Sequence, residues 1–413
     1  MSNSEKPDPK LKKGSSRRLR RRRSKNGLQK LFRLKFAGIA IAIMFVALVI
    51  NRITKQAPPN PSEQTSAIVP LPEIPSAPRP LPTWAKERSL SIPSRKPGEE
   101  NTEIVYNIKM PPSFKQSKDL QAIVDDLVSI AEKNNLPKEP LSITLIDADN
   151  GEIAGYKQNE PRYPASVIKM FWMVELYAQI ENGIWPDEDA FKTYISMMIK
   201  KSDNEAASFI VDEITNTQFH RELEPEELKV WINKREQLNR FFQEAGYKGI
   251  DIKQKTFPIP YLKVEEPEGS DLQMRGDPKQ PIRNKITTKQ AARLIYEICG
   301  IGQAVSPEAS EKMCDWLQRD LNPQIWKKQP PNPIEFNPVE SFFGEALPSD
   351  AQLASKAGWT SGTRAEAAFV TAKDAQAAYI LVIFADDPAY AADKKIFPEM
   401  SRLVYKRMSD RHK

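Results

Sequence analysis

The sequence predicts an α/β protein, an α+β sandwich in which the two ends of one folded domain build a single antiparallel sheet. Strand patterns occur near the start of the segment 99–413, at Leu141–Asp147, and again near its end, at Glu366–Thr371 and Ala378–Phe384. Long helical patterns fill the region between them. We therefore expect helices to flank the sheet and an inserted all-α lobe to occupy the middle of the domain.

The N-terminal elements follow from apolar spacing and turn signals. Lys118–Asn134 places its apolar side chains on one helical face, and Pro137 ends the helix. Leu141–Asp147 alternates as a strand does. Asn150-Gly151 is a hairpin signal, so Glu152–Lys157 is expected to return as the second strand.

Three further helices complete the prediction. Pro164–Glu181 is apolar nearly all round, which is typical of a helix buried at the centre of a domain. Glu205–Ile214 follows a capping sequence, and Phe397–Arg407 reads as a final helix.

Charge is concentrated at the N-terminus of the 413-residue chain. The formal net charge is +7, but residues 1–35 carry 14 Lys or Arg against two acids, so the rest of the chain is net negative. A run such as Arg17–Lys25 could bind nucleic acid. An apolar stretch follows at once, however, and favours a basic cytoplasmic tail beside an uncleaved transmembrane signal anchor at residues 36–51. We expect no nucleic-acid partner.

A proline-rich segment follows the apolar stretch. Eleven prolines lie between Ala57 and Gly98, and such a composition cannot bury enough apolar surface to fold. Residues 52–98 are therefore expected to form an extended linker. The domain 99–413 would be held outside a bacterial inner membrane by a single-pass anchor, with the N-terminus in the cytoplasm.

Histidine and cysteine are scarce. His220, Cys299, Cys314 and His412 are too few and too scattered for a zinc cluster, so we expect neither a metal nor a cofactor. A Ser-His-Asp triad would depend on His220 alone. A nucleophilic enzyme would therefore use another base. Cys299 and Cys314 are either a disulfide, in an oxidising compartment, or two buried thiols.

Ser166-Val167-Ile168-Lys169 opens the apolar helix. Residues i and i+3 share a helical face, so the Ser166 hydroxyl and the Lys169 amine can meet. Burial lowers a lysine pKa, and a neutral amine can take the serine proton. The structural alternative is an N-cap serine beside a lysine that extends to solvent.

Two more motifs follow in the chain. Lys201-Ser202-Asp203-Asn204 precedes the Glu205–Ile214 helix, where a simple N-cap is the alternative reading. Lys356-Ala357-Gly358 lies on an expected edge strand before Glu366–Thr371. The alternative interpretation is a segment that merely leads into a β-turn. Together, in this order, the three motifs are far less probable by chance than any one alone.

S-x-x-K, then S-D-N, then K-[ST]-G is the signature order of class A β-lactamases and penicillin-binding proteins. The segment from Lys118 to the C-terminus, about 70% of the chain, resembles the class A β-lactamase domain. PRYPASVIKMFWMVELYAQIENG is similar to the nucleophile helix of that family, and KSDNEAASFIVDEI to its S-D-N helix. The resemblance implies a β-lactamase/transpeptidase-like fold and a serine hydrolase. We expect this hydrolase to be a monomer, held at the membrane by the signal anchor.

The resemblance implies roles for individual residues. Ser166 would attack the substrate carbonyl and form an acyl-enzyme, Lys169 would take or relay its proton, and Ser202 would pass a proton to the leaving nitrogen. Asn204, Lys356, Gly358, Trp359 and Arg364 would bind substrate. Among these, the N–H groups of Ser166 and Trp359 would form the oxyanion hole, and Arg364 would bind the carboxylate.

Two departures from the family pattern leave the reaction open. Ala357 replaces the motif hydroxyl that grips the substrate carboxylate. The deacylating glutamate corresponds to Glu266 in Glu266-Pro267-Glu268, of which the second half of the family pattern is lost. With a working Glu266 the chain would hydrolyse β-lactams. Without it, the chain would be a D-Ala-D-Ala peptidase or penicillin-binding protein acting on peptidoglycan, or a weakly catalytic peptidoglycan-binding module.

Overall fold

The structure is a computed structural model that describes residues 103–106, 108, 111–185, 188–189, 191–259, 265–328, 336–373 and 377–412. The chain divides into two compact units, residues 1–76 and 77–413, and every described residue belongs to the second. The expected basic tail, signal anchor and linker lie outside the described residues. Within the described ranges, no helix combines the length and the apolar character needed to cross a membrane.

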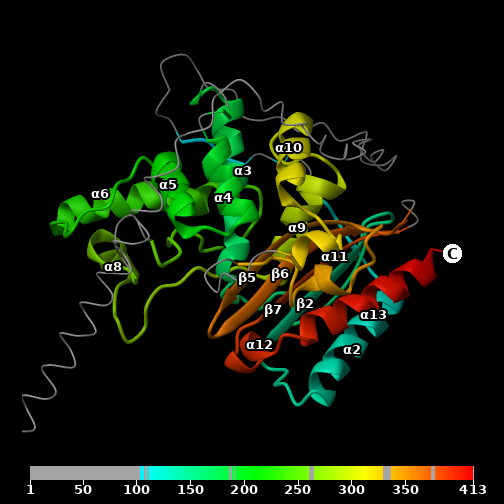
Figure 1. Ribbon diagram of the computed structural model, residues 1–413. Coiled ribbons are helices and arrows are strands. Elements are labelled where there is room, and N and C mark those ends of the chain that lie inside the picture. The colour runs from blue at the N-terminus through cyan, green and yellow to red at the C-terminus, as the bar shows by residue number, and fades with distance from the viewer. Residues whose placement is uncertain are drawn as a thin grey trace, which may run out of the picture. The chain divides into compact units, whose positions relative to one another are not determined.

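A seven-stranded sheet forms the framework, in the order β1-β3-β2-β7-β6-β5-β4 (Figure 1). The strands are β1 (Lys115–Gln116), β2 (Leu141–Asp147), β3 (Glu152–Tyr156), β4 (Gln318–Arg319), β5 (Gln352–Thr360), β6 (Thr363–Thr371) and β7 (Ala378–Ala385). All neighbours pair antiparallel except β1 and β3, which are parallel. Because β2 pairs directly with β7, the sheet joins the two ends of the domain, as the sequence predicts.

Helices surround this sheet in the described part of the chain. They are α2 (Lys118–Lys133), α3 (Lys169–Glu181), α4 (Lys192–Lys200), α5 (Asn204–Thr215), α6 (Pro225–Arg235), α7 (Gln237–Gln243), α8 (Gly269–Arg275), α9 (Thr288–Ile295), α10 (Pro307–Leu317), α11 (Pro323–Trp326), α12 (Pro388–Ala392) and α13 (Ile396–Arg411). Two 3₁₀ turns, η2 (Ala165–Ile168) and η5 (Phe343–Ala346), and a π-helical turn, η4 (Tyr296–Gly300), complete the elements.

Two hydrophobic layers cover the two faces of the sheet. On one face, α2 and α13 lie side by side and pack with η5 (Figure 1). On the other face, α9 and the central helix α3 belong to a layer that continues into the helical lobe of α4, α5 and α7. All seven residues of β2 are buried, although its sequence alternates, because helices cover both faces.

The local predictions agree closely with these elements. α2, β2, β3, β6, β7 and α13 begin and end within a few residues of the predicted boundaries. Two details differ. The nucleophile helix begins with the 3₁₀ turn η2 rather than as regular α-helix. β5 is not the last strand of the sheet, because β4 pairs with Leu353 and Ala354; the segment that carries Lys356 and Gly358 lies beyond that two-residue contact.

The two cysteines form a disulfide. Cys299 in η4 and Cys314 in α10 are bonded, with 5.2 Å between their Cα atoms. The bond joins two consecutive helical segments that pack against the same hydrophobic layer as α3. The alternative of two buried thiols, left open by the sequence, is thereby excluded.

Candidate active site

The turn η2 presents Ser166 beside strand β5. Ala165, the residue before it, has a φ of +45°, in the left-handed region that alanine rarely adopts. Such strain at a non-glycine residue is typical of functional sites, where the surrounding structure holds it in place. Ser166 is half-buried, and its hydroxyl has no hydrogen-bond partner among the described residues. The hydroxyl is therefore available to a ligand.

Gly358 brings β5 unusually close to this turn. A methyl group at its Cα would lie 2.7 Å from the Ser166 nitrogen and 3.0 Å from the Pro164 oxygen. Only glycine permits this approach of two backbones. The same approach places the backbone of Trp359, the next residue, at the edge of the Ser166 turn.

Lys169 is fully buried at the start of α3. Its Nζ donates to the Ser202 main-chain oxygen at 2.6 Å and to Asn204 Oδ1 at 2.8 Å. Burial lowers the pKa of Lys169 to about 7, and the charge of Asp203 opposes this shift only partly. Near neutral pH a large fraction of Lys169 is therefore an uncharged amine, the form that can accept a proton.

The S-D-N turn is held in a conformation that local propensity disfavours. Ser202 has a φ of +57°. Asp203 caps α5 by accepting a hydrogen bond from the Ala206 N–H at 2.7 Å, as expected of a residue at this position. Asn204 is thereby the first residue of α5, with its side chain toward Lys169.

Lys356 links the third motif to the second. Its Nζ donates to Ser202 Oγ at 2.8 Å and to the Ala357 oxygen at 2.8 Å. Lys356 is fully buried, and burial is the main reason that its pKa lies well below the ordinary value; repulsion by Lys169 and Arg319 adds to this, and Glu366 opposes it. Its hydrogen bond places Lys356 where it can exchange a proton with a group reached through Ser202.

Five residues predicted from the three motifs therefore meet at one place. Ser166 and Lys169 share the η2–α3 segment, Lys169 contacts Ser202 and Asn204, and Ser202 contacts Lys356. These residues come from three segments distant in sequence, so the site exists only in the folded domain.

The structure does not bring Arg364 into this site, contrary to expectation. In the β5–β6 register Lys356 is opposite Ala367, so Arg364, three residues from Ala367, points to the other face of the sheet. There its guanidinium donates to the main-chain oxygens of Ser341, Tyr390 and Ala391 at 2.9–3.0 Å. This buried side chain fastens the segment before η5 and α12 to the sheet.

Trp359 and Ala357 take different positions. The Trp359 side chain is 50% exposed, and its indole Nε1 donates to the Ala391 oxygen at 2.8 Å. Ala357 is fully buried in the layer that contains α2 and α13. At the position where the family motif has a hydroxyl-bearing residue, this chain therefore has a methyl group that makes apolar contacts inside the core.

Glu266 lies apart from the motif residues. It is exposed in the loop that leads into α8, where its charge acts on Arg275. Within the described residues, it hydrogen-bonds to no member of the site. The carboxylate charge that acts on Lys169 is that of Asp203, in the S-D-N turn. The role of Glu266 as a water-activating base stays a prediction that this geometry does not support.

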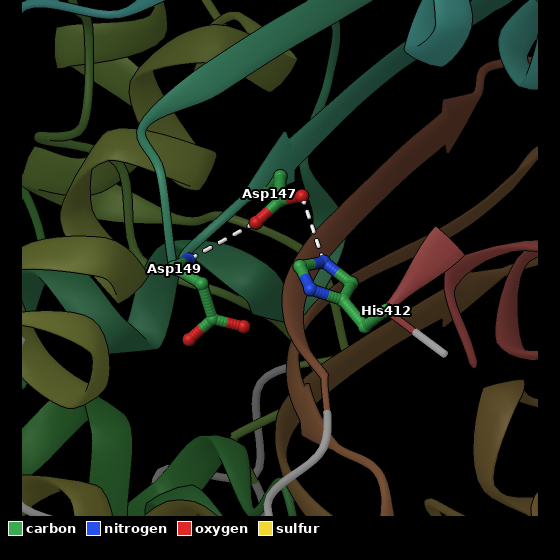
Figure 2. A group of neighbouring side chains, drawn as sticks. All are labelled: Asp147, Asp149 and His412. Atoms are coloured by element: carbon green, nitrogen blue, oxygen red, sulfur yellow. Dashed lines mark hydrogen bonds and ion pairs between the residues drawn. The ribbon is translucent and has the colours of Figure 1, made fainter. Parts of the chain in front are cut away.

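A group of possible metal ligands lies elsewhere, at the end of β2. Figure 2 shows Asp147, Asp149 and His412, whose ligand atoms lie within 4.8 Å of one another. His412 Nε2 is 2.9 Å from Asp147 Oδ2, and the Arg411 Nε donates to that same oxygen at 3.2 Å. Because the Arg411 guanidinium already neutralises Asp147, these three side chains are better explained as contacts that hold the end of α13 against β2 than as a cation site.

Sequence reasoning missed two residues at the margin of the site. Arg319 is buried next to β5 and repels Lys356. The ring of Phe336 lies 5.7 Å from Lys356 Nζ. Neither belongs to a motif. The sequence signal that could have pointed to Arg319 is an arginine near the end of the helical segment SEKMCDWLQRD.

Comparison with solved structures finds several similar chains. The solved structures similar to this chain include the β-lactamase from Sphaerobacter thermophilus, with 16% identity over 70% of this chain and 97% of that chain and a TM-score of 0.48. A mutant of PBP-A in an acyl-enzyme complex with penicillin G has 16% identity over 73% and 100% of the two chains, with a TM-score of 0.48. The class A β-lactamase of the last common ancestor of Gram-negative bacteria has 17% identity over 69% and 98%, with a TM-score of 0.45.

No curated protein matches the chain. The model of one protein family, described as the Beta-lactamase enzyme family, matches residues 185–408, which is more than half of the sequence. That range includes the S-D-N turn and the strand of Lys356, and it begins after Ser166. The chain belongs to the Beta-lactamase enzyme family.

Proposed function

We propose that this protein is a serine hydrolase that forms a long-lived acyl-enzyme on Ser166 with β-lactams, and that its natural reaction is on the D-Ala-D-Ala peptides of peptidoglycan. The observation that carries the proposal is that Lys169 and Lys356 both donate to Ser202, to its main-chain oxygen and its hydroxyl respectively, near a Ser166 hydroxyl that has no partner among the described residues. The long lifetime of the acyl-enzyme is inferred from the position of Glu266.

Acylation begins when the neutral Lys169 amine takes the proton of the Ser166 hydroxyl. Ser166 Oγ then bonds to the carbonyl carbon of the substrate amide. The negative charge that develops on the carbonyl oxygen would be accepted by the N–H groups of Ser166 and Trp359; the close approach of Gly358 to the Ser166 nitrogen supports this role. Asn204 is positioned to bind the amide side chain of the substrate.

The amide C–N bond then breaks, and its nitrogen needs a proton. Ser202 is suited to give it, because its hydroxyl accepts a hydrogen bond from Lys356 at 2.8 Å and can be reprotonated from that ammonium. The lowered pKa of Lys356 makes this transfer easier than from an ordinary lysine. In a β-lactam the nitrogen stays attached to the ester; in a peptide it leaves with the terminal D-alanine.

Hydrolysis of the ester needs a water and a base. Glu266 is exposed and has no hydrogen bond to Ser166 or Lys169, which favours slow deacylation over efficient β-lactam hydrolysis. The β-lactamase reaction remains the second candidate, supported by the Glu266-Pro267-Glu268 pattern alone. The departure at Ala357 favours neither branch.

We further propose that a signal anchor at residues 36–51 and a linker at 52–98 hold the catalytic domain outside the cytoplasm, as a single-pass protein of a bacterial inner membrane. The basic tail before the apolar stretch supports this orientation. The disulfide between Cys299 and Cys314 is also typical of an oxidising compartment.

A time course of intact mass tests the reaction. The full-length protein is mixed with benzylpenicillin, beside Ser166→Ala and a control, Ser129→Ala, in which a serine of α2 is changed. We expect an adduct of the mass of the drug on the wild type and on Ser129→Ala, persisting for many minutes, and none on Ser166→Ala. An adduct that also forms on Ser166→Ala would refute the assignment of the nucleophile.

The variant Glu266→Gln decides between the two branches. If Glu266 is a surface carboxylate, the adduct decays at the wild-type rate in this variant. If the wild-type adduct disappears within seconds while drug is consumed, and Glu266→Gln makes it persist at least 10²-fold longer, as loss of a general base would, the protein is a β-lactamase and the proposed slow deacylation is wrong.

A further inference from the structure

Arg319 forms half of the two-residue strand β4, and it is buried although it belongs to none of the three motifs. Its backbone pairs with Leu353 of β5. Burying a guanidinium is costly unless its donors find acceptors. The acceptors that Arg319 finds are main-chain oxygens on either side of the active site.

Arg319 Nη2 donates to two of these oxygens at once. One is the oxygen of Ile199 at 3.0 Å, and the other is the oxygen of Ser355 at 2.6 Å. Ile199 lies in the last turn of α4, three residues before Ser202, and Ser355 directly precedes Lys356. The carbonyl groups of a final helical turn lack partners within the helix and carry partial negative charge, so a buried arginine suits this position.

We propose that Arg319 is a positioning residue that joins the Ser202 turn to the Lys356 strand and so keeps the Lys356 Nζ–Ser202 Oγ hydrogen bond in place. The inference rests on the proposed function and concerns the step that protonates the leaving nitrogen. One side chain bonded to both segments limits how far they can separate. Loss of the bridge therefore lets Ser202 and Lys356 move apart.

Arg319 also acts on Lys356 through its charge. The charged groups that act on Lys356 are Lys169 from α3, Arg319 from β4 and Glu366 from β6. Burial lowers the pKa of Arg319 to about 10, so it remains a cation at neutral pH. A cation beside Lys356 disfavours its protonated form, so removal of Arg319 raises the pKa of Lys356.

The experiment compares Arg319→Met, which removes charge and donors, with Arg319→Lys, which keeps the charge on a side chain that cannot span both oxygens. The second-order rate of acylation by a fluorescent penicillin is measured from pH 6 to 10 on full-length protein. Arg293→Met is the control, because Arg293 bonds to Glu297 and contacts none of the five motif residues.

We expect Arg319→Met to lower the maximal acylation rate about tenfold or more, and to move the alkaline limb of the profile to higher pH. Arg319→Lys is expected to lower the maximal rate several-fold and to leave the limb where the wild type has it. The control loses stability without moving the limb. If Arg319→Met does not fold, Arg319→Lys still decides: a wild-type rate in that variant overturns the proposal.

Two other outcomes also overturn it. One is a pH profile of Arg319→Met in which the alkaline limb lies where the wild type has it and the maximal acylation rate falls no more than in Arg293→Met. The other is a Lys356 titration that is unchanged in Arg319→Met. It is measured by ¹³C NMR of ε-labelled lysines, in which the Lys356 signal is assigned by its loss in Lys356→Arg. This NMR measurement needs no acylation, so it separates failure of the inference from failure of the proposed function.

Discussion

Replacing Gly358 with alanine tests the closest backbone contact of the active site. The added methyl group would lie 2.7 Å from the Ser166 nitrogen, 3.0 Å from Ala165 Cβ and 3.0 Å from the Pro164 oxygen. Ordinary contacts begin at 3.4 Å, so β5 and η2 must separate by about 0.7 Å. None of the three atoms is the end of a flexible side chain, and overpacking of this kind costs about 1–3 kcal/mol of folding free energy.

The effect on acylation should exceed the effect on stability. Displacement by most of an ångström separates the Ser166 and Trp359 N–H groups that would bind the carbonyl oxygen, and misplacement on this scale costs about 10²-fold in rate. The assay is the rate of labelling by a fluorescent penicillin, with thermal unfolding measured in parallel. Gly362→Ala is the matched control, since nothing lies within 4 Å of its added methyl group. Wild-type labelling by Gly358→Ala would refute the reasoning.

Three further predictions follow from buried groups. If neutral Lys169 is the base, the acylation rate rises about tenfold per pH unit below pH 7 and stops rising near pH 7; a rate that continues to rise up to about pH 10 would contradict the assignment. Burial raises the pKa of Glu175 to about 8, so between pH 4.5 and 8 the folded chain holds a proton that the unfolded chain releases. The free energy of unfolding therefore falls with rising pH by up to about 5 kcal/mol, and Glu175→Gln should flatten this slope in urea titrations. Reduction of the Cys299–Cys314 disulfide, which closes a loop of sequence separation 15, should lower stability by about 3 kcal/mol, and a double alanine variant should not respond to reductant.

Patterns over a few neighbouring residues predicted most of the secondary-structure elements of the fold. Periodicity located α2, β2, β3, β6, β7 and α13 to within a few residues, because apolar spacing and turn residues act over a few positions. The order of the three motifs predicted that Ser166, Lys169 and Lys356 share a site. The exception was the first turn of the nucleophile helix, which is the 3₁₀ turn η2 rather than regular α-helix, a difference that apolar spacing does not reveal.

Local sequence patterns predict the secondary-structure elements and the chemistry of the motif residues, because both depend on short stretches of chain. Which long-range partners those residues meet depends on how the whole domain packs. In a strand one residue of register changes the face, so Arg364 points away from the site that the family resemblance implied for it. A surface loop left Glu266 exposed, and a two-residue strand placed Arg319 between Ile199 and Ser355. Such contacts arise from the packing of segments that are not adjacent in the sequence, 120 residues apart for Arg319 and Ile199, and no local pattern records them.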